Sequence, residues 1–588
     1  MKWNILKKLT CVLNKKQQRK IWGLGVLILI GGLLETLGIS MILPLVTTIL
    51  DVERMAQNEY VQLICSTLHI SNMNHFLIVL LLAVIAVFVI KNVYSLFLAY
   101  VQARFVTSNQ HRAGSYMLEE YLNRPYEFYL NADIPTIFRI LDGDIPKVFQ
   151  LLLALIKLAT EAVVAICIFF VLLVVDMGMT LLMVVLLLVM SLVITKLLKP
   201  ILNRIGKENQ EVQSVAGRWR TKAVYGIKDV KVLGREHFFA SFYEKHTEHG
   251  RDLSIKYSVL NNVPRTVIET VCIAGVLSYI VLCIARGVDV TSLATQLTAF
   301  GGAAIRLMPS MNRINTYMAE IAFYEPSLDY VYENVDFEKY KTEGKYTTDA
   351  PINPQPIEVS GDIELKDITY TYPNVEKKIL DHANMTVPLG KSVGVVGPSG
   401  AGKSTVIDIF LGLLRAQEGS ILCNGRNVLD NYPSWLSKIG YIPQSIYLSD
   451  DSIRDNIAFG IAKDKIDDER VWQVLEEAQM RTFVEALPDG LNTSTGDRGV
   501  RISGGERQRL GIARALYHDP DILVFDEATS ALDNATEKAV MEAINSFHGK
   551  KTMVIIAHRL NTIEKCDIIY RVEKGQIIEQ TKDGAGKA

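Results

Sequence analysis

The stretch Gly397-Pro-Ser-Gly-Ala-Gly-Lys-Ser-Thr405 decides the fold of the second half of the chain. It follows an apolar run at Val393–Val396 and precedes a helical pattern at Val406–Leu414. A glycine-rich loop between a strand and a helix turns backbone N–H groups toward phosphate oxygens, and the N-terminus of the helix adds a positive potential. The sequence therefore predicts a P-loop inside an α/β domain, because a glycine-rich turn without a ligand does not require this context.

The polar residues of this loop have distinct predicted roles. We expect the Lys403 ammonium to reach the β- and γ-phosphates of ATP and the Ser404 hydroxyl to bind Mg²⁺. The predicted phosphate-binding residues are Gly397, Ser399, Gly400, Ala401, Gly402, Lys403, Ser404 and Thr405.

Two carboxylates end a second apolar strand in Asp521-Ile-Leu-Val-Phe-Asp526-Glu527. Taken alone, an acidic pair at a strand end is usually a helix cap or a solvated turn. Downstream of a P-loop, the same pair indicates a metal ligand, Asp526, followed by a general base that polarises a water, Glu527. The sequence therefore predicts ATP hydrolysis.

The first half of the chain has a different character, because it contains apolar runs of about 20 residues, long enough to cross a membrane. We predict six spans, at Ile21–Leu50, Phe76–Tyr100, Val148–Val175, Thr180–Leu198, Val267–Ala285 and Leu293–Tyr317. Lysine and arginine crowd the N-terminal flank and the connections 101–147 and 199–264, which places both termini and these connections in the cytosol.

The domain organisation follows from these patterns. We expect a transmembrane domain at 1–330, a proline-containing linker at 331–360 and an α/β domain at 361–588. Strands are expected at Ile363–Tyr372, Ser392–Val396, Ile439–Ile442, Ile522–Phe525 and Met553–Ala557, in a largely parallel sheet covered by helices. The formal net charge of −1 gives no support for nucleic acid as a partner.

Further motifs make the second half similar to the nucleotide-binding domain of ABC transporters. Ile502-Ser-Gly-Gly-Glu506 resembles the family signature LSGGQ, with isoleucine for leucine and glutamate for glutamine. The other matches are Gln444 for the Q-loop, Ser530-Ala-Leu-Asp533 for the D-loop, His558 for the switch histidine, Tyr372 for the adenine-stacking aromatic, and Gly496-Asp-Arg-Gly499 for the exporter X-loop.

This resemblance implies a role for each motif. Gln444 and His558 would join Glu527 in catalysis, and Gln444 would also contact the metal beside Ser404 and Asp526. Ser503, Gly504 and Gly505 would bind the ATP held by the P-loop of a second subunit, with Asp533 at the same interface. Because the chain carries one copy of each motif, and all look intact, the resemblance implies a homodimer.

The resemblance also implies the overall architecture. It is that of an exporter-like α-helical membrane domain of six helices fused to an α/β P-loop ABC domain. The protein would lie in the plasma or inner membrane, with the nucleotide domain cytosolic. The breaks near Asn131 and Tyr225 would be the coupling helices that transmit closure of the nucleotide domains.

Basic residues inside the predicted spans bear on the cargo. Lys91, Arg265 and Arg306 would form a six-cation cavity in a homodimer, suited to a phosphate or pyrophosphate group. Alternatively, Arg265 lies at the interface, and Lys91 or Arg306 pairs with Glu35, Glu161 or Glu269.

Local sequence resembles the PglK family of bacterial lipid-linked oligosaccharide flippases. The matching stretches are Glu35-Thr-Leu-Gly-Ile-Ser-Met-Ile-Leu-Pro44, Asn262-Val-Pro-Arg265 and Arg306-Leu-Met-Pro-Ser-Met-Asn-Arg-Ile314. The resemblance implies a polyprenyl-pyrophosphate oligosaccharide moved from the cytosolic to the outer leaflet, with Arg265 and Arg306 on the pyrophosphate. Lys91 stands where that family has arginine, and Tyr60, Val61, Ile64 and Leu68 would form an outer amphipathic helix.

Two other functions remain open at this stage. One is export of a peptide, another lipid or a drug, and the other is an ATP-gated channel or sensor. Dispensable cations at 91, 265 and 306 would favour the first, whereas ATP turnover that does not respond to any cargo would favour the second.

Overall fold

The computed structural model describes residues 3–41, 61, 73–175, 177–285, 290–334, 357–373, 375–496, 499–528, 534–557 and 563–580. The chain divides into two compact units. The helical unit comprises residues 1–124 and 132–347, and the sheet unit comprises residues 125–131 and 348–588.

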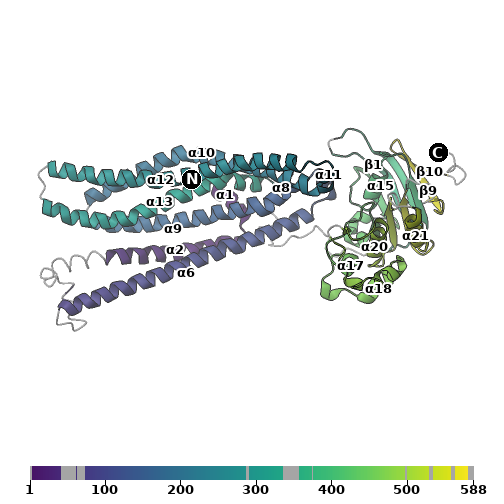
Figure 1. The fold of residues 1–588 in the computed structure, drawn as a ribbon, viewed down its shortest axis with the longest axis horizontal. Helices are drawn as coiled ribbons and strands as arrows, with labels where there is room; N and C mark the ends of the chain where they lie inside the picture. The colour runs from purple at the N-terminus through teal and green to yellow at the C-terminus, as the bar shows by residue number, and fades with distance from the viewer. Residues whose placement is uncertain are drawn as a thin grey trace. The chain divides into compact units, whose positions relative to one another are not determined.

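Long helices build the helical unit, and Figure 1 shows them running alongside one another. Each predicted span lies at least partly in one of the long helices; the first runs on into residues 42–50, which are outside the described part of the chain. The helices are α1 (Trp3–Val12), α2 (Lys15–Ser40), α6 (Met73–Leu122), α8 (Ile134–Arg139), η1 (Ile140–Asp144), α9 (Ile145–Val175), α10 (Met177–Tyr225), α11 (Ile227–Val232), α12 (Glu236–Ala285) and α13 (Val290–Asn334).

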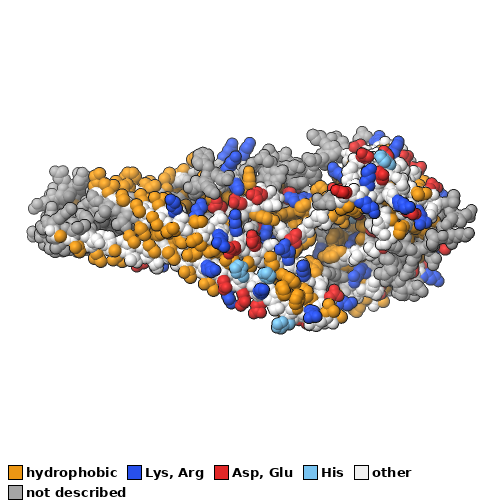
Figure 2. Space-filling view, turned by 90° about the horizontal axis from the view of Figure 1, so that it is seen from above, with side chains coloured by type: hydrophobic (Ala, Val, Ile, Leu, Met, Phe, Trp, Pro, Cys, Tyr) orange, Lys and Arg blue, Asp and Glu red, His pale blue; other side chains and the backbone are white. Residues whose placement is uncertain are grey.

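The surface of this unit fits a lipid environment over part of its length. Within the described residues, Lys15–Gly38, His75–Leu122 and Ile134–Val171 are long and apolar enough to cross a membrane. Large apolar side chains on α6, such as Leu82 and Leu96, are exposed. On the face in Figure 2, hydrophobic side chains cover one end of the unit, whereas charged side chains gather toward the other end. An apolar surface of this size requires lipid or another partner to cover it.

A fully buried carboxylate ties three helical segments together near the end of η1. The Asp144 carboxylate accepts hydrogen bonds from Gln210 Nε2 on α10 at 3.0 Å and from Ser327 Oγ on α13 at 2.8 Å. Its second oxygen forms an ion pair with Arg139 Nε at 3.2 Å. η1 is a π-helix, whose wider turn is common at functional positions. Asp144 therefore fixes α8, α10 and α13 relative to one another.

The sheet unit contains two sheets. A six-stranded sheet has the order β10-β9-β3-β8-β7-β6, in which only β9 and β10 pair antiparallel. Its strands are β3 (Ser392–Val396), β6 (Ile439–Ile442), β7 (Ile522–Asp526), β8 (Thr552–Ile556), β9 (Ile568–Glu573) and β10 (Gln576–Gln580). This sheet is the predicted largely parallel one.

The second sheet departs from the prediction, because its four strands pair antiparallel in the order β2-β1-β4-β5. The predicted strand Ile363–Tyr372 ends at Tyr370 and belongs here rather than to the parallel sheet. The strands are β1 (Ile363–Tyr370), β2 (Leu380–Val387), β4 (Glu418–Cys423) and β5 (Arg426–Asn427). Its apolar residues share one core with β3, so the two sheets pack face to face.

Helices complete the sheet unit. The helix after the P-loop, α15, runs over Lys403–Phe410, which is earlier than the predicted Val406–Leu414. The others are α16 (Tyr432–Ser437), α17 (Ile453–Ile457), α18 (Asp468–Glu477), α19 (Arg481–Glu485), α20 (Gly504–Leu516) and α21 (Asn534–Asn545), with short 3₁₀ turns at Val428–Asn431, Lys463–Lys465 and Gly490–Asn492.

A short helix from the first cytosolic break belongs to the sheet unit. Helix α7 (Tyr126–Leu130) groups with it although its neighbours in sequence do not. Glu127 Oε1 accepts hydrogen bonds from the Tyr370 hydroxyl at 3.4 Å and from the backbone N–H of Arg415 at 3.3 Å. Short helices thus occur close to both predicted breaks, α7 near Asn131 and α11 just after Tyr225.

Loss of the Asp144 carboxylate should destabilise the helical unit. In Asp144→Ala, Arg139, Gln210 and Ser327 lose a buried partner, and breaking a buried ion pair costs about 3 kcal/mol or more. We expect a clearly lower thermal unfolding midpoint for the purified full chain in detergent. Ser115→Ala is the control, because this exposed hydroxyl bonds only within its own helix, and its midpoint should stay unchanged. Equal midpoints for both variants would contradict the role given to Asp144.

Candidate nucleotide and cargo sites

The P-loop has the backbone that its glycines require. Gly402, which precedes α15, has φ +103°, and Gly397 has φ +156°. A Cβ at Gly397 would lie 2.4 Å from the carbonyl oxygen of Val572, and one at Gly402 would lie 2.8 Å from the Ile379 side chain. Glycine is therefore needed at both positions for conformation and for space. The loop opens α15, whose N-terminal N–H groups are available for phosphate oxygens.

Two side chains of the loop have environments that suit their predicted roles. The buried Lys403 ammonium donates to the carbonyl oxygens of Gly397 at 3.0 Å and Pro398 at 3.2 Å, so the loop curls around it. The Ser404 side chain, next in sequence, is exposed. The lysine is thus held at the loop that would receive the phosphates, and the serine hydroxyl is open to a ligand.

The carboxyl ends of parallel strands bring the catalytic candidates to the same edge as the P-loop. The P-loop follows β3, Gln444 follows β6, and Asp526 ends β7. Gln444 Nε2 donates to the Glu527 carboxylate at 2.7 Å. Glu527 has φ +48°, a left-handed conformation that turns the chain away from the strand direction directly after Asp526. The structure therefore joins Gln444 and Glu527, which are far apart in sequence.

The electrostatics at Asp526 favour a bound cation. Burial and the neighbouring Glu527 carboxylate raise the pKa of Asp526, against the lowering effects of the Tyr441 hydroxyl and Lys403. The Tyr441 hydroxyl donates to Asp526 Oδ2 at 3.4 Å. Clustered negative charge is relieved by a divalent cation, and hard oxygen donors are those that Mg²⁺ prefers. Asp526 and Ser404 therefore fit Mg²⁺, which in such sites takes remaining ligands from substrate phosphates.

Asp408 is a carboxylate of this site that sequence reasoning missed. It lies on α15, and burial, followed by the charge of Asp526, raises the pKa of Asp408 to about 6. Asp408 lies within an apolar helical pattern, and nothing in the local sequence indicates that it is close to Asp526, more than a hundred residues later. The signal that could have found it is the helical spacing from Lys403 and Ser404, which places it one turn further along α15.

Tyr372 lies against the P-loop helix. Its hydroxyl is 3.0 Å from Thr405 Oγ1, and its ring meets that of Tyr370 edge to face, with centroids 5.2 Å apart. The side chain is half-buried, so part of its surface remains free beside the loop. This position is compatible with the predicted contact to adenine, which stays a prediction.

The signature stretch caps helix α20. The Ser503 hydroxyl accepts from the Glu506 N–H at 3.4 Å, and the Glu506 carboxylate accepts from the Ser503 N–H at 2.9 Å. This reciprocal capping box explains why glutamate serves at a position where the family has glutamine. The Ser503 hydroxyl hydrogen remains available for donation, and Ser503 and Gly504 are exposed, whereas Gly505 is buried.

Several predicted residues fall outside the described part of the chain. These are His558, the D-loop Ser530–Asp533, Asp497 of the X-loop, and the outer segment 58–68 apart from Val61. Arg306 lies on α13, but its side chain is not described.

The cations of the helical unit have different partners. Lys91 Nζ lies 2.9 Å from Glu35 Oε1 in a buried ion pair, and 4.7 Å from the centre of the Phe88 ring. Glu161 pairs with Arg313, at 2.6 Å from its Nε, rather than with Lys91. Arg265 is exposed on α12. Of the alternatives raised from the sequence, the pairing of Lys91 with Glu35 is the one observed.

Comparisons with known proteins agree with this architecture. Residues 21–286 match the model of the ABC transporter transmembrane region, and residues 380–530 match that of the ABC transporter, an ATP-binding domain. A bacterial Atm1-family ABC exporter with ATP bound has the same fold, with a TM-score of 0.74 and 21% identity over 96% of this chain and 94% of that chain. This confirms the predicted fold class.

Curated relatives extend the similarity across both halves. The ATP-dependent lipid A-core flippase of Vibrio cholerae serotype O1 is 30% identical over 392 residues, which is 66% of this chain and 66% of that protein. The protein of the same name from Cupriavidus metallidurans is 30% identical over 437 residues, 72% of this chain and 70% of that protein. The chain therefore belongs to the ABC transporter family, as an exporter-type half-transporter that joins a transmembrane region to an ATP-hydrolysing domain.

Proposed function

We propose that this protein uses ATP hydrolysis to move a lipid-anchored, phosphate-bearing glycan from the cytosolic to the outer leaflet of a membrane. The observation that carries the proposal is that one chain contains both a nucleotide site and a bundle of membrane-length helices. One part holds Lys403, Gln444, Asp526 and Glu527 around one sheet edge, and the other is a bundle of apolar helices that contains basic residues.

The proposed nucleotide step uses the groups gathered at the sheet edge. The P-loop backbone and Lys403 bind the ATP phosphates, and Glu527 accepts a proton from the attacking water. Mg²⁺, held by Ser404, Asp526 and Gln444, would neutralise charge that develops on the phosphates. The Gln444 amide orients the Glu527 carboxylate through the 2.7 Å hydrogen bond. His558 is proposed to contact the γ-phosphate, and Tyr372 to stack on the adenine.

The assembly is proposed to be a homodimer. An exposed Ser503 at the start of α20, with a hydroxyl hydrogen free to donate, suits a phosphate supplied by another subunit. Each ATP would then be bound between the P-loop of one subunit and Ser503, Gly504 and Gly505 of the other, with Asp533 at the same interface. The nucleotide domain would lie in the cytosol, beside a plasma or inner membrane.

The cargo proposal depends on the basic residues of the helical unit. Charges inside a bilayer are costly unless they meet a partner or a water-filled space. Glu35 already neutralises Lys91, so we assign the anion contact first to Arg265 and Arg306, with Lys91 available only to an anion that competes with Glu35. Two guanidinium groups from each subunit suit the bidentate binding of a pyrophosphate. The finer proposal is therefore a polyprenyl-pyrophosphate oligosaccharide.

A second cargo has its own support. The curated relatives include ATP-dependent lipid A-core flippases, so a glycolipid of the lipid A type is the alternative. Both cargoes combine acyl or prenyl chains with sugar phosphate, and both would use the same cations. Translocation assays with each lipid in parallel proteoliposomes separate the two cargoes.

Glu527→Gln should bind ATP but hydrolyse it slowly, since the amide has nearly the shape of the carboxylate and cannot accept the proton. We expect ATPase activity to fall by about 100-fold or more, with ATP binding retained. Phosphate release and binding of a labelled ATP analogue by the reconstituted full chain measure the two effects. Glu542→Gln, an exposed carboxylate on α21, is the matched control and should keep wild-type turnover. Normal turnover in Glu527→Gln would rule out its role as the base.

Arg306→Ala should abolish ATP-dependent translocation of the polyprenyl-pyrophosphate oligosaccharide in proteoliposomes while basal ATPase activity persists. The reason is that the variant removes a proposed anion contact and leaves the nucleotide site intact. Arg204→Ala serves as the control, because this residue is exposed and, among the described residues, pairs with Glu208 of its own helix, at 2.8 Å.

Equal loss of both activities in Arg306→Ala would indicate a folding defect. Translocation that persists in Arg306→Ala would contradict the assignment. Wild-type protein that hydrolyses ATP and moves neither lipid would exclude the glycan cargo and leave peptides, other lipids and drugs. ATP turnover that no cargo changes would favour a channel or a sensor.

A further inference from the structure

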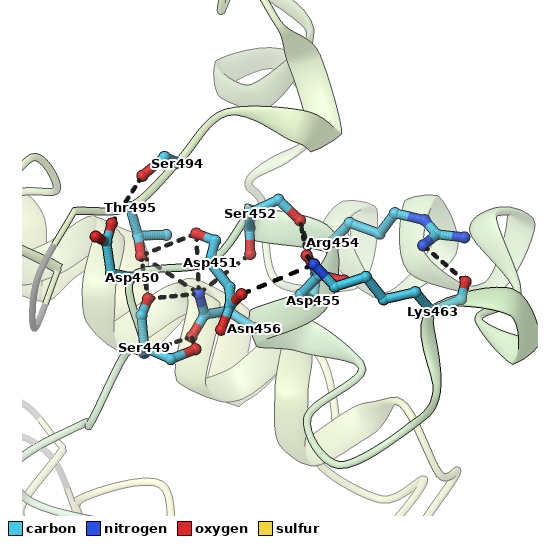
Figure 3. A network of polar contacts seen from close by, with 10 residues as sticks. All are labelled: Ser449, Asp450, Asp451, Ser452, Arg454, Asp455, Asn456, Lys463, Ser494 and Thr495. Atoms are coloured by element: carbon cyan, nitrogen blue, oxygen red, sulfur yellow. Dashed lines mark hydrogen bonds and ion pairs between the residues drawn. The ribbon is translucent and has the colours of Figure 1, made fainter. Parts of the chain in front are cut away.

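A buried asparagine contacts three segments of the sheet unit: the residues that follow Gln444, the residues around Thr495, and helix α20. Asn456 is at the end of α17, only 1% of it is exposed, and Figure 3 shows its side-chain amide at the centre of a polar network. We propose that Asn456 is a positioning residue that couples the segment after Gln444 to the signature helix α20. The inference rests on the proposed nucleotide function and deepens it, because it names the residue that would hold Ser503 in position relative to Gln444.

The amide of Asn456 is fully used. Its Nδ2 donates to the carbonyl oxygens of Ser449 at 3.0 Å, Ser452 at 3.1 Å and Asp451 at 3.4 Å. Its Oδ1 accepts from the Ser449 N–H at 3.0 Å. The Asn456 amide therefore binds the backbone of the whole turn at 449–452. Only asparagine and the longer glutamine carry an amide, which combines N–H donors with a carbonyl acceptor. Removing the amide would take one donor from each of these carbonyl oxygens and the acceptor from the Ser449 N–H, although each carbonyl keeps a second donor: Thr495 Oγ1 for Ser449, the Thr495 N–H for Asp451 and the Asn456 N–H for Ser452.

A first route runs from this turn to α20 through Arg514. The Arg514 guanidinium donates from Nε to the Asn456 carbonyl at 2.7 Å and from a second nitrogen to Asn456 Oδ1 at 3.1 Å. Its third nitrogen donates to the Tyr447 carbonyl at 2.7 Å. Tyr447 lies three residues after Gln444, and Ser503 caps the helix that carries Arg514. A movement of the Gln444 segment is thereby passed to α20.

A second route reaches the signature from the other side. The buried Thr495 hydroxyl donates to the Ser449 carbonyl at 2.7 Å and accepts from Asn456 Nδ2 at 3.3 Å. The Thr495 carbonyl in turn accepts from the Arg501 N–H at 3.2 Å, two residues before Ser503. The first route therefore reaches the last turn of α20, at Arg514, and the second reaches Arg501, just before the start of the same helix.

The outer part of the network does not make this link. Ser452 Oγ contacts Asp455 at 2.7 Å, Lys463 lies 3.3 Å from Asp455, and Ser494 donates to Asp450 at 3.1 Å (Figure 3). Lys463 and Asp450 are exposed, and exposed ion pairs contribute little to stability. We therefore assign the coupling to the buried residues Asn456 and Thr495, and not to exposed charged residues such as Lys463 and Asp450.

The test is the dependence of ATPase activity on ATP concentration for the full chain in proteoliposomes. Asn456→Ala should raise the KM for ATP by about tenfold, because Ser503 no longer meets ATP in register, and Thr495→Val should raise it less, in the same direction. Asn431→Ala is the matched control: Asn431 is also a buried asparagine, and its side chain caps α16 by accepting from the Ser434 N–H, so its KM should be that of the wild type. A purely structural role would lower the amount of active protein and kcat without changing KM.

A double-mutant cycle with Gln444→Ala decides whether the coupling passes through the Gln444 segment. If it does, Asn456→Ala should raise KM less in the Gln444→Ala background than in the wild type. Thr495→Val gives the same cycle should Asn456→Ala fail to fold. An unchanged KM in Thr495→Val and Asn456→Ala, or additive effects in the cycle, would overturn the inference while leaving the proposed function standing. Absence of ATP hydrolysis by the wild type would overturn the proposed function and this inference together.

Discussion

The register of four parallel strands, β3, β8, β7 and β6, is the constraint on which the nucleotide site depends. β7 pairs with β8 through Asp526 and Ile556, and with β6 through Phe525 and Ile442. The side chains of a strand alternate between its faces, so a slip of one residue would turn Asp526 away from the P-loop. The buried residues Ile522–Phe525 prevent this slip, because their apolar side chains fill the cores on both faces of the sheet. Apolar packing thus sets the position of the charged chemistry.

The helical unit has the opposite constraint: it is largely apolar, and the charged side chains among its helices need partners that offset the cost of removing them from water. Buried ions are stable only with close partners. The pairs Lys91 with Glu35 and Arg313 with Glu161 satisfy this condition. Paired cations attract an anionic cargo less than unpaired ones do, which is why the proposed cargo contact does not begin at Lys91. Neutralisation of Lys91 and recognition of cargo are therefore competing uses of one residue.

Sequence reasoning recovered the features that local patterns encode. The P-loop, the acidic end of β7 and the long apolar helices each depend on neighbouring residues, and the structure shows each of them. The antiparallel sheet of β1, β2, β4 and β5 was missed because the pairing of β1 with β4, which joins its two halves, spans the P-loop and α15. Asp408 and Asn456 were missed for a related reason: their significance comes from Asp526 and Arg514, which are distant in sequence. The partner of Lys91 was narrowed from the sequence to three carboxylates, and distance alone selected Glu35.

The chemistry of the Gln444 amide links these observations. Its nitrogen donates a hydrogen bond to the Glu527 carboxylate. The carbonyl oxygen of the same amide could then serve as a ligand of a metal ion. One side chain would thus contact both the proposed base and the proposed metal ion, so a displacement of residue 444 would change the position of both. The chain after it is anchored three residues later, where the Tyr447 carbonyl binds Arg514. The contacts of Gln444 with Glu527 and of Tyr447 with Arg514 therefore connect the proposed base to the signature helix within a single subunit.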